Sequence, residues 1–100
     1  MMTLEEATAK VSKMAETHGG KFGSKVNFNF KGEGTVHLDD TVSPAKVILE
    51  DAEAPCTLVM ELDNFEKLLK GDLNPMMAFM TGKMKVEGDK AVAMKLASLF

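Results

Sequence analysis

The sequence contains no arginine, tryptophan or tyrosine, and its single cysteine is Cys56. Without arginine the chain lacks the planar guanidinium group that contacts phosphate and guanine in a bidentate manner, and its 12 lysines are outnumbered by 15 acids. We therefore expect no binding of nucleic acid. One cysteine excludes an intramolecular disulfide and a thiolate cluster for zinc, so a reducing cytoplasm suits the chain.

Long hydrophobic runs are also missing. No apolar stretch approaches the length that spans a bilayer, and the first residues, MMTLEEATAK, carry acids where a signal peptide needs a basic start. We therefore expect neither export nor a transmembrane segment, and we place the protein in the cytoplasm. A length of 100 residues, with 45% hydrophobic and 27% charged residues, predicts one globular domain over residues 1–100.

Motifs for catalysis are absent as well. The string GGKFGSKV lacks the glycine that a serine-hydrolase elbow needs two residues after Ser24, and the GEG of residues 32–34 lacks the third glycine of a dinucleotide fingerprint. Neither His18 nor His37 has a metal-ligand spacing to another histidine or cysteine. We expect no enzyme activity, no metal and no cofactor. A hydrolase or thioester-handling enzyme would have only Cys56 as its nucleophile, and that residue is typical of a small buried hydrophobe.

Apolar spacing in the first half of the chain predicts one helix followed by strands. The helix starts after Thr3, which forms a capping box with Glu6, and it ends at Gly19 and Gly20. Its apolar stripe is Leu4, Ala7, Val11 and Met14. Alternation then predicts a hairpin over residues 25–40 and a third strand over residues 45–50. His37 falls on the strand face opposite to its apolar neighbours, which we expect to be the wetter face.

The second half predicts two more strands and three helices. The strands cover residues 56–62 and 83–89, with Met84 and Val86 pointing inward from the second. A helix begins at Asp63 or Asn64 and ends at Gly71, and a short helix follows that holds Pro75 in its first turn. A closing helix covers residues 90–100, and its apolar stripe consists of Val92, Leu96, Leu99 and Phe100.

Methionine is abundant, with nine residues in the chain. Met76, Met80, Met84 and Met94 come within the last quarter of the sequence. Flexible, polarizable methionine side chains suit a pocket that adapts to apolar ligands, but they also fill the core of a protein without tryptophan or tyrosine. Spacing alone favours the core, and both interpretations stay open at this point.

Residues 54–96, APCTLVMELDNFEKLLKGDLNPMMAFMTGKMKVEGDKAVAMKL, closely resemble the sterol carrier protein type 2 family. The specific part is a segment of the form NP..AF..GK.K..G, formed here by Asn74, Pro75, Ala78, Phe79, Gly82, Lys83, Lys85 and Gly88. The earlier elements agree with the family in order and carry little identity. Many eukaryotic relatives have polar residues where this chain has Met76 and Met77. The chain also ends at Phe100 without the C-terminal extension and peroxisomal address of those relatives, so we expect a small stand-alone protein of the bacterial type.

The resemblance implies an α+β fold, in which a five-stranded mixed, largely antiparallel sheet is covered by helices and encloses an apolar tunnel. It also implies binding or transfer of a sterol, fatty acid, fatty acyl-CoA or phospholipid inside the cell, with no catalytic residues and with transient membrane contact through the N-terminal helix. Twelve residues are expected to line the tunnel: Phe28, Phe30, Leu58, Met60, Met76, Phe79, Met80, Met84, Val92, Leu96, Leu99 and Phe100. The last four should cover one end of it. The alternative is a protein-interaction module of the same fold with a filled core, and the oligomeric state stays open.

Overall fold

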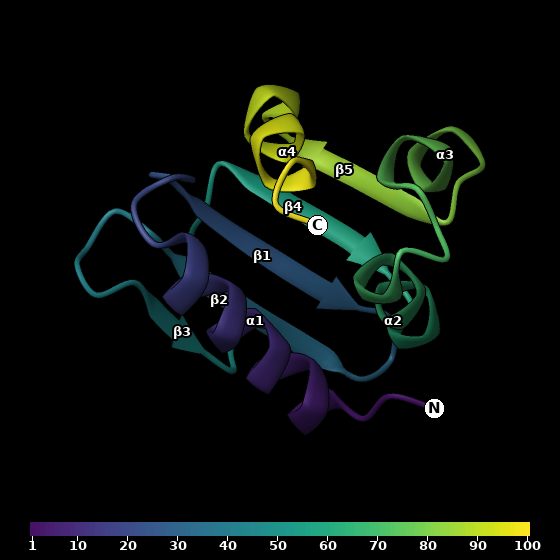
Figure 1. The fold of residues 1–100 in the computed structure, drawn as a ribbon, viewed down its shortest axis with the longest axis horizontal. Coiled ribbons are helices and arrows are strands. Elements are labelled where there is room, and N and C mark those ends of the chain that lie inside the picture. Colours follow the sequence, from purple (N-terminus) through teal and green to yellow (C-terminus); the bar gives the residue numbers. More distant parts are fainter.

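The computed structural model describes all residues from 1 to 100 and contains four helices and five strands (Figure 1). In chain order these are α1 (Leu4–His18), β1 (Lys25–Phe30), β2 (Gly34–Asp39), β3 (Lys46–Ile48), β4 (Cys56–Met60), α2 (Leu62–Lys70), α3 (Pro75–Met80), β5 (Met84–Gly88) and α4 (Lys90–Ala97). Type and order of every element agree with the prediction from sequence.

The five strands form one sheet in the order β3-β2-β1-β4-β5. Three neighbouring pairs are antiparallel, and the central pair of β1 and β4 is parallel. The predicted mixed, largely antiparallel sheet is therefore confirmed. The parallel pair means that the chain, after β1, completes the β2 and β3 side of the sheet before it returns to the centre.

One face of the sheet carries the core. Phe28 lies opposite Leu58 and Phe30 lies opposite Met60 in the parallel pair, and none of the four is more than 1% exposed. Helix α1 packs over β2 and β3, while α4 packs over β4 and β5 (Figure 1). The alternation of apolar residues along each strand predicted this face, because successive side chains in a strand point to opposite sides.

The opposite face of the sheet is covered in part by the connection of residues 49–55. The Asn27 side chain donates to the carbonyl oxygen of Ala52 at 2.6 Å and to the Asp51 carboxylate at 3.3 Å. Its own oxygen lies 2.7 Å from His37 Nδ1. His37 does project from the expected face, but only 5% of it is exposed, so the expectation of a wet environment was wrong. Asn27 holds the loop of residues 49–55 by hydrogen bonds, and the loop thereby shields His37 from water.

Several boundaries differ from the sequence prediction, including the end of β4, which is at Met60 and not at Leu62. Helix α2 begins at Leu62 after Glu61, not at Asp63 or Asn64, because the buried Leu62 is drawn into the core and backbone bonds to the Glu61 carbonyl close the first turn. Strand β3 is only three residues long. Helix α4 ends at Ala97, so Leu99 and Phe100 lie beyond the helix.

Candidate functional site

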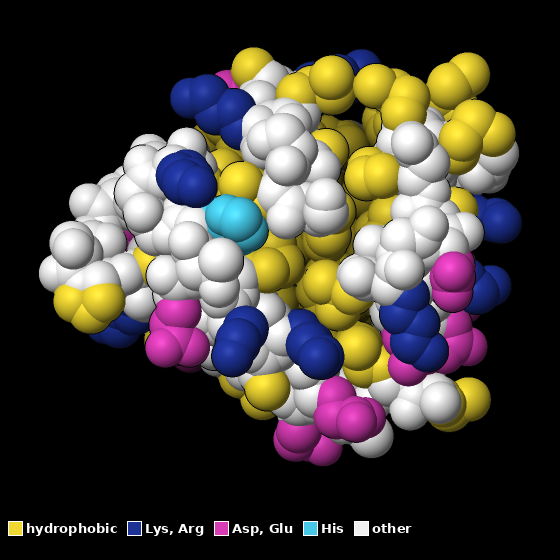
Figure 2. Space-filling model, in the orientation of Figure 1, with side chains coloured by type: hydrophobic (Ala, Val, Ile, Leu, Met, Phe, Trp, Pro, Cys, Tyr) yellow, Lys and Arg dark blue, Asp and Glu magenta, His cyan; other side chains and the backbone are white.

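A narrow apolar groove lies between α3 and α4, above the edge strand β5. Its volume is about 110 Å³, and seven of the nine residues that line it are hydrophobic. The lining residues are Pro75, Met76, Phe79, Met84, Val86, Lys90, Ala93, Met94 and Ala97. On the surface shown in Figure 2, hydrophobic side chains gather over α3 and α4, and the surface is hollowed between them.

Local sequence rules place both walls of the groove. The Asn74 side chain accepts from the backbone N–H of Met76 at 2.8 Å and starts α3, with Pro75 in the first turn. The Asp89 carboxylate accepts from the backbone N–H of Ala91 at 2.9 Å and starts α4. Each helix then presents residues three and four apart on its groove side.

The floor and rim of the groove differ in rigidity. Met84 and Val86 point from β5 toward the helices, and Met84 is 5% exposed. Met76, Phe79 and Met94 form the rim, and between 41% and 57% of each side chain is exposed. Because unbranched methionine changes rotamer at little cost, the rim is the adaptable part of this site.

Lys90 is the only charged residue of the groove lining. Its Nζ lies 6.0 Å from the centroid of the Phe79 ring, on the opposite wall. This distance is at the outer limit of a cation–π contact. The groove therefore combines apolar walls with one positive charge, which suits an amphiphile with an anionic head.

Three of the twelve residues expected from sequence line the groove: Met76, Phe79 and Met84. Five others, Phe28, Phe30, Leu58, Met60 and Leu96, lie in the closed core, at 1% exposure or less. The rings of Phe28 and Phe30 lie 5.7 Å and 5.0 Å from that of Phe65, which fills the space beneath the helices. These five form no wall of the groove.

The remaining four expected residues lie outside the groove lining. Met80 points outward and is 72% exposed, while Val92 is partly buried against the core. Leu99 and Phe100 follow the end of α4 and are also packed against the core. The Phe100 ring meets that of Phe65 edge-on at 6.1 Å.

Six of the lining residues were not among the twelve residues expected to line the tunnel. These are Pro75, Val86, Lys90, Ala93, Met94 and Ala97. The last four are spaced three, one and three apart, so they form a stripe on α4 that could have been found. It was overlooked because two alanines and a lysine give a weaker apolar signal than Val92 and Leu96, which face the core.

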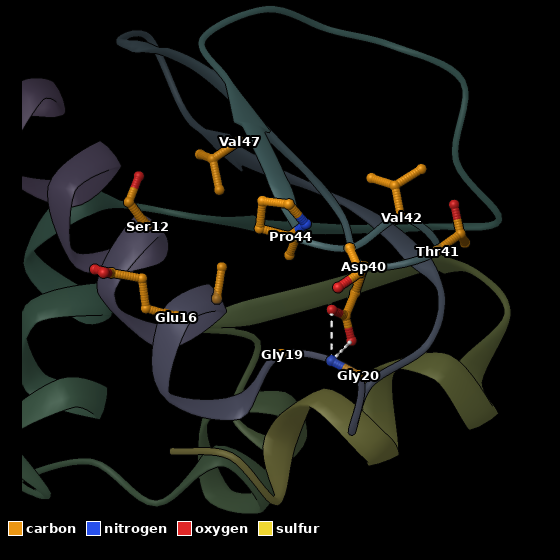
Figure 3. Close-up of a pocket in the computed structure, with 12 residues that line it drawn as sticks. Ser12, Glu16, Gly19, Gly20, Asp40, Thr41, Val42, Pro44 and Val47 are labelled. Atoms are coloured by element: carbon orange, nitrogen blue, oxygen red, sulfur yellow. Dashed lines mark hydrogen bonds between the residues drawn. The ribbon is translucent and has the colours of Figure 1, made fainter.

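A larger hollow of about 790 Å³ lies between the end of α1 and the loop that joins β2 to β3 (Figure 3). Only four of its 12 lining residues are hydrophobic. The Asp40 carboxylate at its edge accepts from the backbone N–H groups of Gly20, Phe22 and Gly23, at 2.7 to 3.1 Å. Asp40 thereby fixes the segment between α1 and β1. Polar walls make this hollow a poor match for an apolar chain.

A family model described as the SCP-2 sterol transfer family matches residues 3–100. The chain belongs to the SCP-2 sterol transfer family. Human sterol carrier protein 2 is 35% identical over 83 residues, which cover 81% of this chain and 15% of that protein. Mouse hydroxysteroid dehydrogenase-like protein 2 is 40% identical over 76 residues, covering 72% of this chain and 16% of that protein. The chain thus spans about one sixth of the length of these curated relatives.

Solved structures of this family share the fold. Palmitated SCP2L2 from Aedes aegypti superposes with a TM-score of 0.75 and 20% identity, covering 98% of this chain and 94% of that one. Binding or transfer of lipids in general is the function that membership of the SCP-2 family supports.

The remaining features of this SCP-2 family member that bear on function are its cysteine, its potential metal ligands and its helices. Cys56 is 1% exposed, and burial, followed by the nearby Asp89 charge, raises the pKa of its thiol. No three His, Cys, Asp or Glu side chains are grouped to hold a metal ion. None of the helices combines the length and apolar character needed to cross a membrane.

Proposed function

We propose that the protein is a non-enzymatic, cytoplasmic lipid carrier that holds an acyl chain in the groove between α3 and α4. The observation that carries this proposal is the lining itself, in which seven hydrophobic residues surround one lysine. Acyl chains gain about 0.8 kcal/mol for each buried methylene group, so even a short groove contributes useful affinity. Lys90 would meet a carboxylate or phosphate at the rim.

The size of the groove favours one ligand class over others. Pockets for small ligands usually have volumes of roughly 300 to 1,000 Å³, and this groove has about 110 Å³. A flexible fatty acid or fatty acyl-CoA chain enters once Met76 and Met94 move aside, whereas a rigid sterol or a two-chain phospholipid requires α3 and α4 to separate. The palmitated state named for the Aedes aegypti neighbour supports a single acyl chain. The apolar tunnel expected from sequence would therefore form only when α3 and α4 separate around a ligand.

The non-enzymatic part of the proposal is supported by the state of the lone cysteine. A nucleophilic thiol needs a lowered pKa and access to substrate. Cys56 has a raised pKa and is buried beneath α4, away from the groove lining.

A displacement assay with a fluorescent fatty acid tests the carrier function. Saturated fatty acids of increasing length should compete with rising affinity, about 0.8 kcal/mol for each added methylene group, until the chain exceeds the groove. A flat series would indicate adsorption to the surface and would overturn the proposal.

A matched pair of variants locates the site. Ala97 lines the groove, whereas Ala91 lies on the exposed side of the same helix. Ala97→Leu should lower fatty-acid affinity about tenfold, equivalent to the loss of roughly two buried methylene groups, and Ala91→Leu should leave it unchanged. Equal effects of both substitutions would place the lipid elsewhere.

The filled core favours a second candidate, an interaction module of the same fold. Phe28, Phe30 and Phe65 occupy the space beneath the helices and are completely buried. Such packing gives a stable domain without a ligand. Native mass spectrometry after mild purification separates the two candidates, because a carrier retains lipid that organic extraction removes. Absence of any retained lipid, together with no displacement by fatty acids, would favour the interaction module.

A further inference from the structure

Helix α3 is apolar on both of its sides. Pro75, Met76 and Phe79 face the groove, and Ala78 is its only buried residue. Met77 and Met80 are not part of the groove lining, and 53% and 72% of their side chains are exposed. A surface helix normally exposes polar residues to water, so the exposed Met77 and Met80 indicate a binding surface.

The exposed residues of this region form one surface, which we call the α3 patch: Met76, Met77, Phe79, Met80 and Met94. Each has between 41% and 72% of its side chain exposed. Figure 2 shows the corresponding concentration of hydrophobic side chains over α3 and α4. The groove accounts for Met76, Phe79 and Met94, because lipid would cover them. It does not account for Met77 and Met80, which are not part of its lining.

Two lysines lie beside the α3 patch. Lys83 follows α3 and Lys90 lines the groove, and neither forms a salt bridge, since the protein's only one joins Lys70 to Glu66. Residues 73–100 carry 4 Lys against 2 acids, a net charge of +2, whereas residues 1–72 carry 8 Lys against 13 acids, a net charge of −5. Acidic side chains visible in Figure 2 lie mainly over α1 and α2.

We propose that the α3 patch docks onto the surface of a bilayer that contains anionic phospholipid, with Met77 and Met80 entering the interface. Apolar side chains flanked by lysines are what such a surface attracts. The inference rests on the proposed function, because a carrier must present the mouth of its groove to a bilayer. A second copy of the chain fits less well, since two patches packed face to face would bring lysines of the same sign together.

The docking element differs from the one expected from sequence. The N-terminal helix α1 exposes Glu5, Glu6 and Glu16 together with Lys10 and Lys13, so its surface has no excess of positive charge. It also buries its apolar residues Ala7 and Val11 against the sheet. Helix α1 therefore serves as an internal control for α3.

Sedimentation with vesicles tests the inference. Wild-type protein should bind vesicles of phosphatidylcholine with phosphatidylserine more tightly than vesicles of phosphatidylcholine alone. Binding should weaken as salt rises, because charges on the surface are screened beyond about 8 Å at physiological ionic strength. Lack of binding to either vesicle would overturn the proposal.

Two sets of variants locate the docking surface. Met77→Gln and Met80→Gln keep length and helix propensity, and each should weaken binding to the anionic vesicles roughly tenfold. Leu49→Gln is the matched control, because Leu49 is 51% exposed beside the opposite edge strand β3. Lys83→Gln should weaken binding about fivefold, while Lys10→Gln on α1 should have little effect.

The outcomes separate docking from lipid binding. Met77 does not line the groove, so Met77→Gln should keep the thermal stability and the solution affinity for the fluorescent fatty acid. If fatty acid fails to bind wild-type protein while Met77→Gln still weakens vesicle binding, the carrier function is wrong and the docking surface stands. Unchanged vesicle binding by both methionine variants, greater loss with the α1 variant, or a wild-type dimer that Met77→Gln dissociates would each overturn the docking surface.

Discussion

The Lys90 ammonium group of α4 lies 6.0 Å from the centre of the Phe79 ring of α3, across the mouth of the groove. The two side chains belong to different helices, and both are exposed at the surface. Lys90 thus stays available to a ligand, while Phe79 offers its ring both to the lysine and to an acyl chain. This pair links the apolar and charged parts of the proposed site.

Lys90→Gln should weaken the binding of a long-chain fatty acid about fivefold, since an exposed ion pair contributes up to about 1 kcal/mol. The methyl ester of the same acid should bind both proteins equally, because it has no charge. Lys85→Gln is the control, since Lys85 lies on β5 beside the inward-pointing Met84 and Val86 and projects to the other face of the sheet. Titration of the acid and of its methyl ester into wild type and both variants measures these affinities. An equal loss of affinity for the acid and the ester would mean that Lys90 acts only through packing.

Phe100→Ala should lower the free energy of unfolding by about 1 to 3 kcal/mol, less than for a fully buried phenylalanine. The residue is partly buried and contacts Phe65 edge-on, so the substitution opens the core from the end of the chain. Lipid affinity should fall by less than stability does. Urea unfolding and fatty-acid titration on one sample measure both, with the exposed Ser98→Ala as control. Unchanged stability with lower affinity would instead support the expectation from sequence that Phe100 covers one end of a lipid tunnel.

Asp40→Asn should destabilise the protein by about 2 to 3 kcal/mol. One carboxylate accepts from three backbone N–H groups, and hydrogen bonds to charged acceptors are the stronger class. Asp39→Asn provides the control, because Asp39 binds only its neighbour Thr41 at the surface. Urea unfolding of the two variants should show the larger loss for Asp40, and equal losses would contradict a clamping role.

Because of Cys56, the free energy of unfolding should decrease as pH rises into the alkaline range. Burial raises the pKa of its thiol in the folded state, so the unfolded chain loses the proton first. Below the pKa of the thiol in the unfolded chain, the thiol is neutral in both the folded and the unfolded state, and its contribution to the free energy of unfolding is fully present. This contribution is lost as pH rises from near 9.0, the ordinary pKa of the thiol, toward the raised pKa of the folded state. Urea midpoints between neutral and alkaline pH should fall less steeply for Cys56→Ala than for wild type, and identical slopes would contradict the shift.

Most of the fold could be predicted from local pattern. The capping box of Thr3 and Glu6 forms as expected, with bonds of 2.9 and 3.1 Å, because its partners are only three residues apart. Alternation in β1 and β4 placed Phe28 and Leu58 on the core face, since the pleat leaves each side chain only two directions. The start of α2 was missed because burial of Leu62 overrode the preference of Asp63 for a cap.

The candidate site was less predictable. Met76, Met80 and Met84 look alike in sequence, yet one lines the groove rim, one faces outward and one forms the floor. The difference depends on the angle of α3 above β5, which follows from contacts between distant segments. Ala93 and Ala97 were missed because small residues give a weak apolar signal along a helix.

The sequence by itself determined the elements and the core face of each strand, because periodicity, caps and turn residues act over a few positions. The resemblance of residues 54–96 indicated the family that the family model shows. Tertiary structure alone decided that β5 is an edge strand and that α3 and α4 leave a groove above it. It also decided that Phe28, Phe30 and Phe65 close the interior. Apolar residues gain free energy by leaving water in any direction, so their pattern shows that they will be covered, and only the packing of the whole chain selects what covers them.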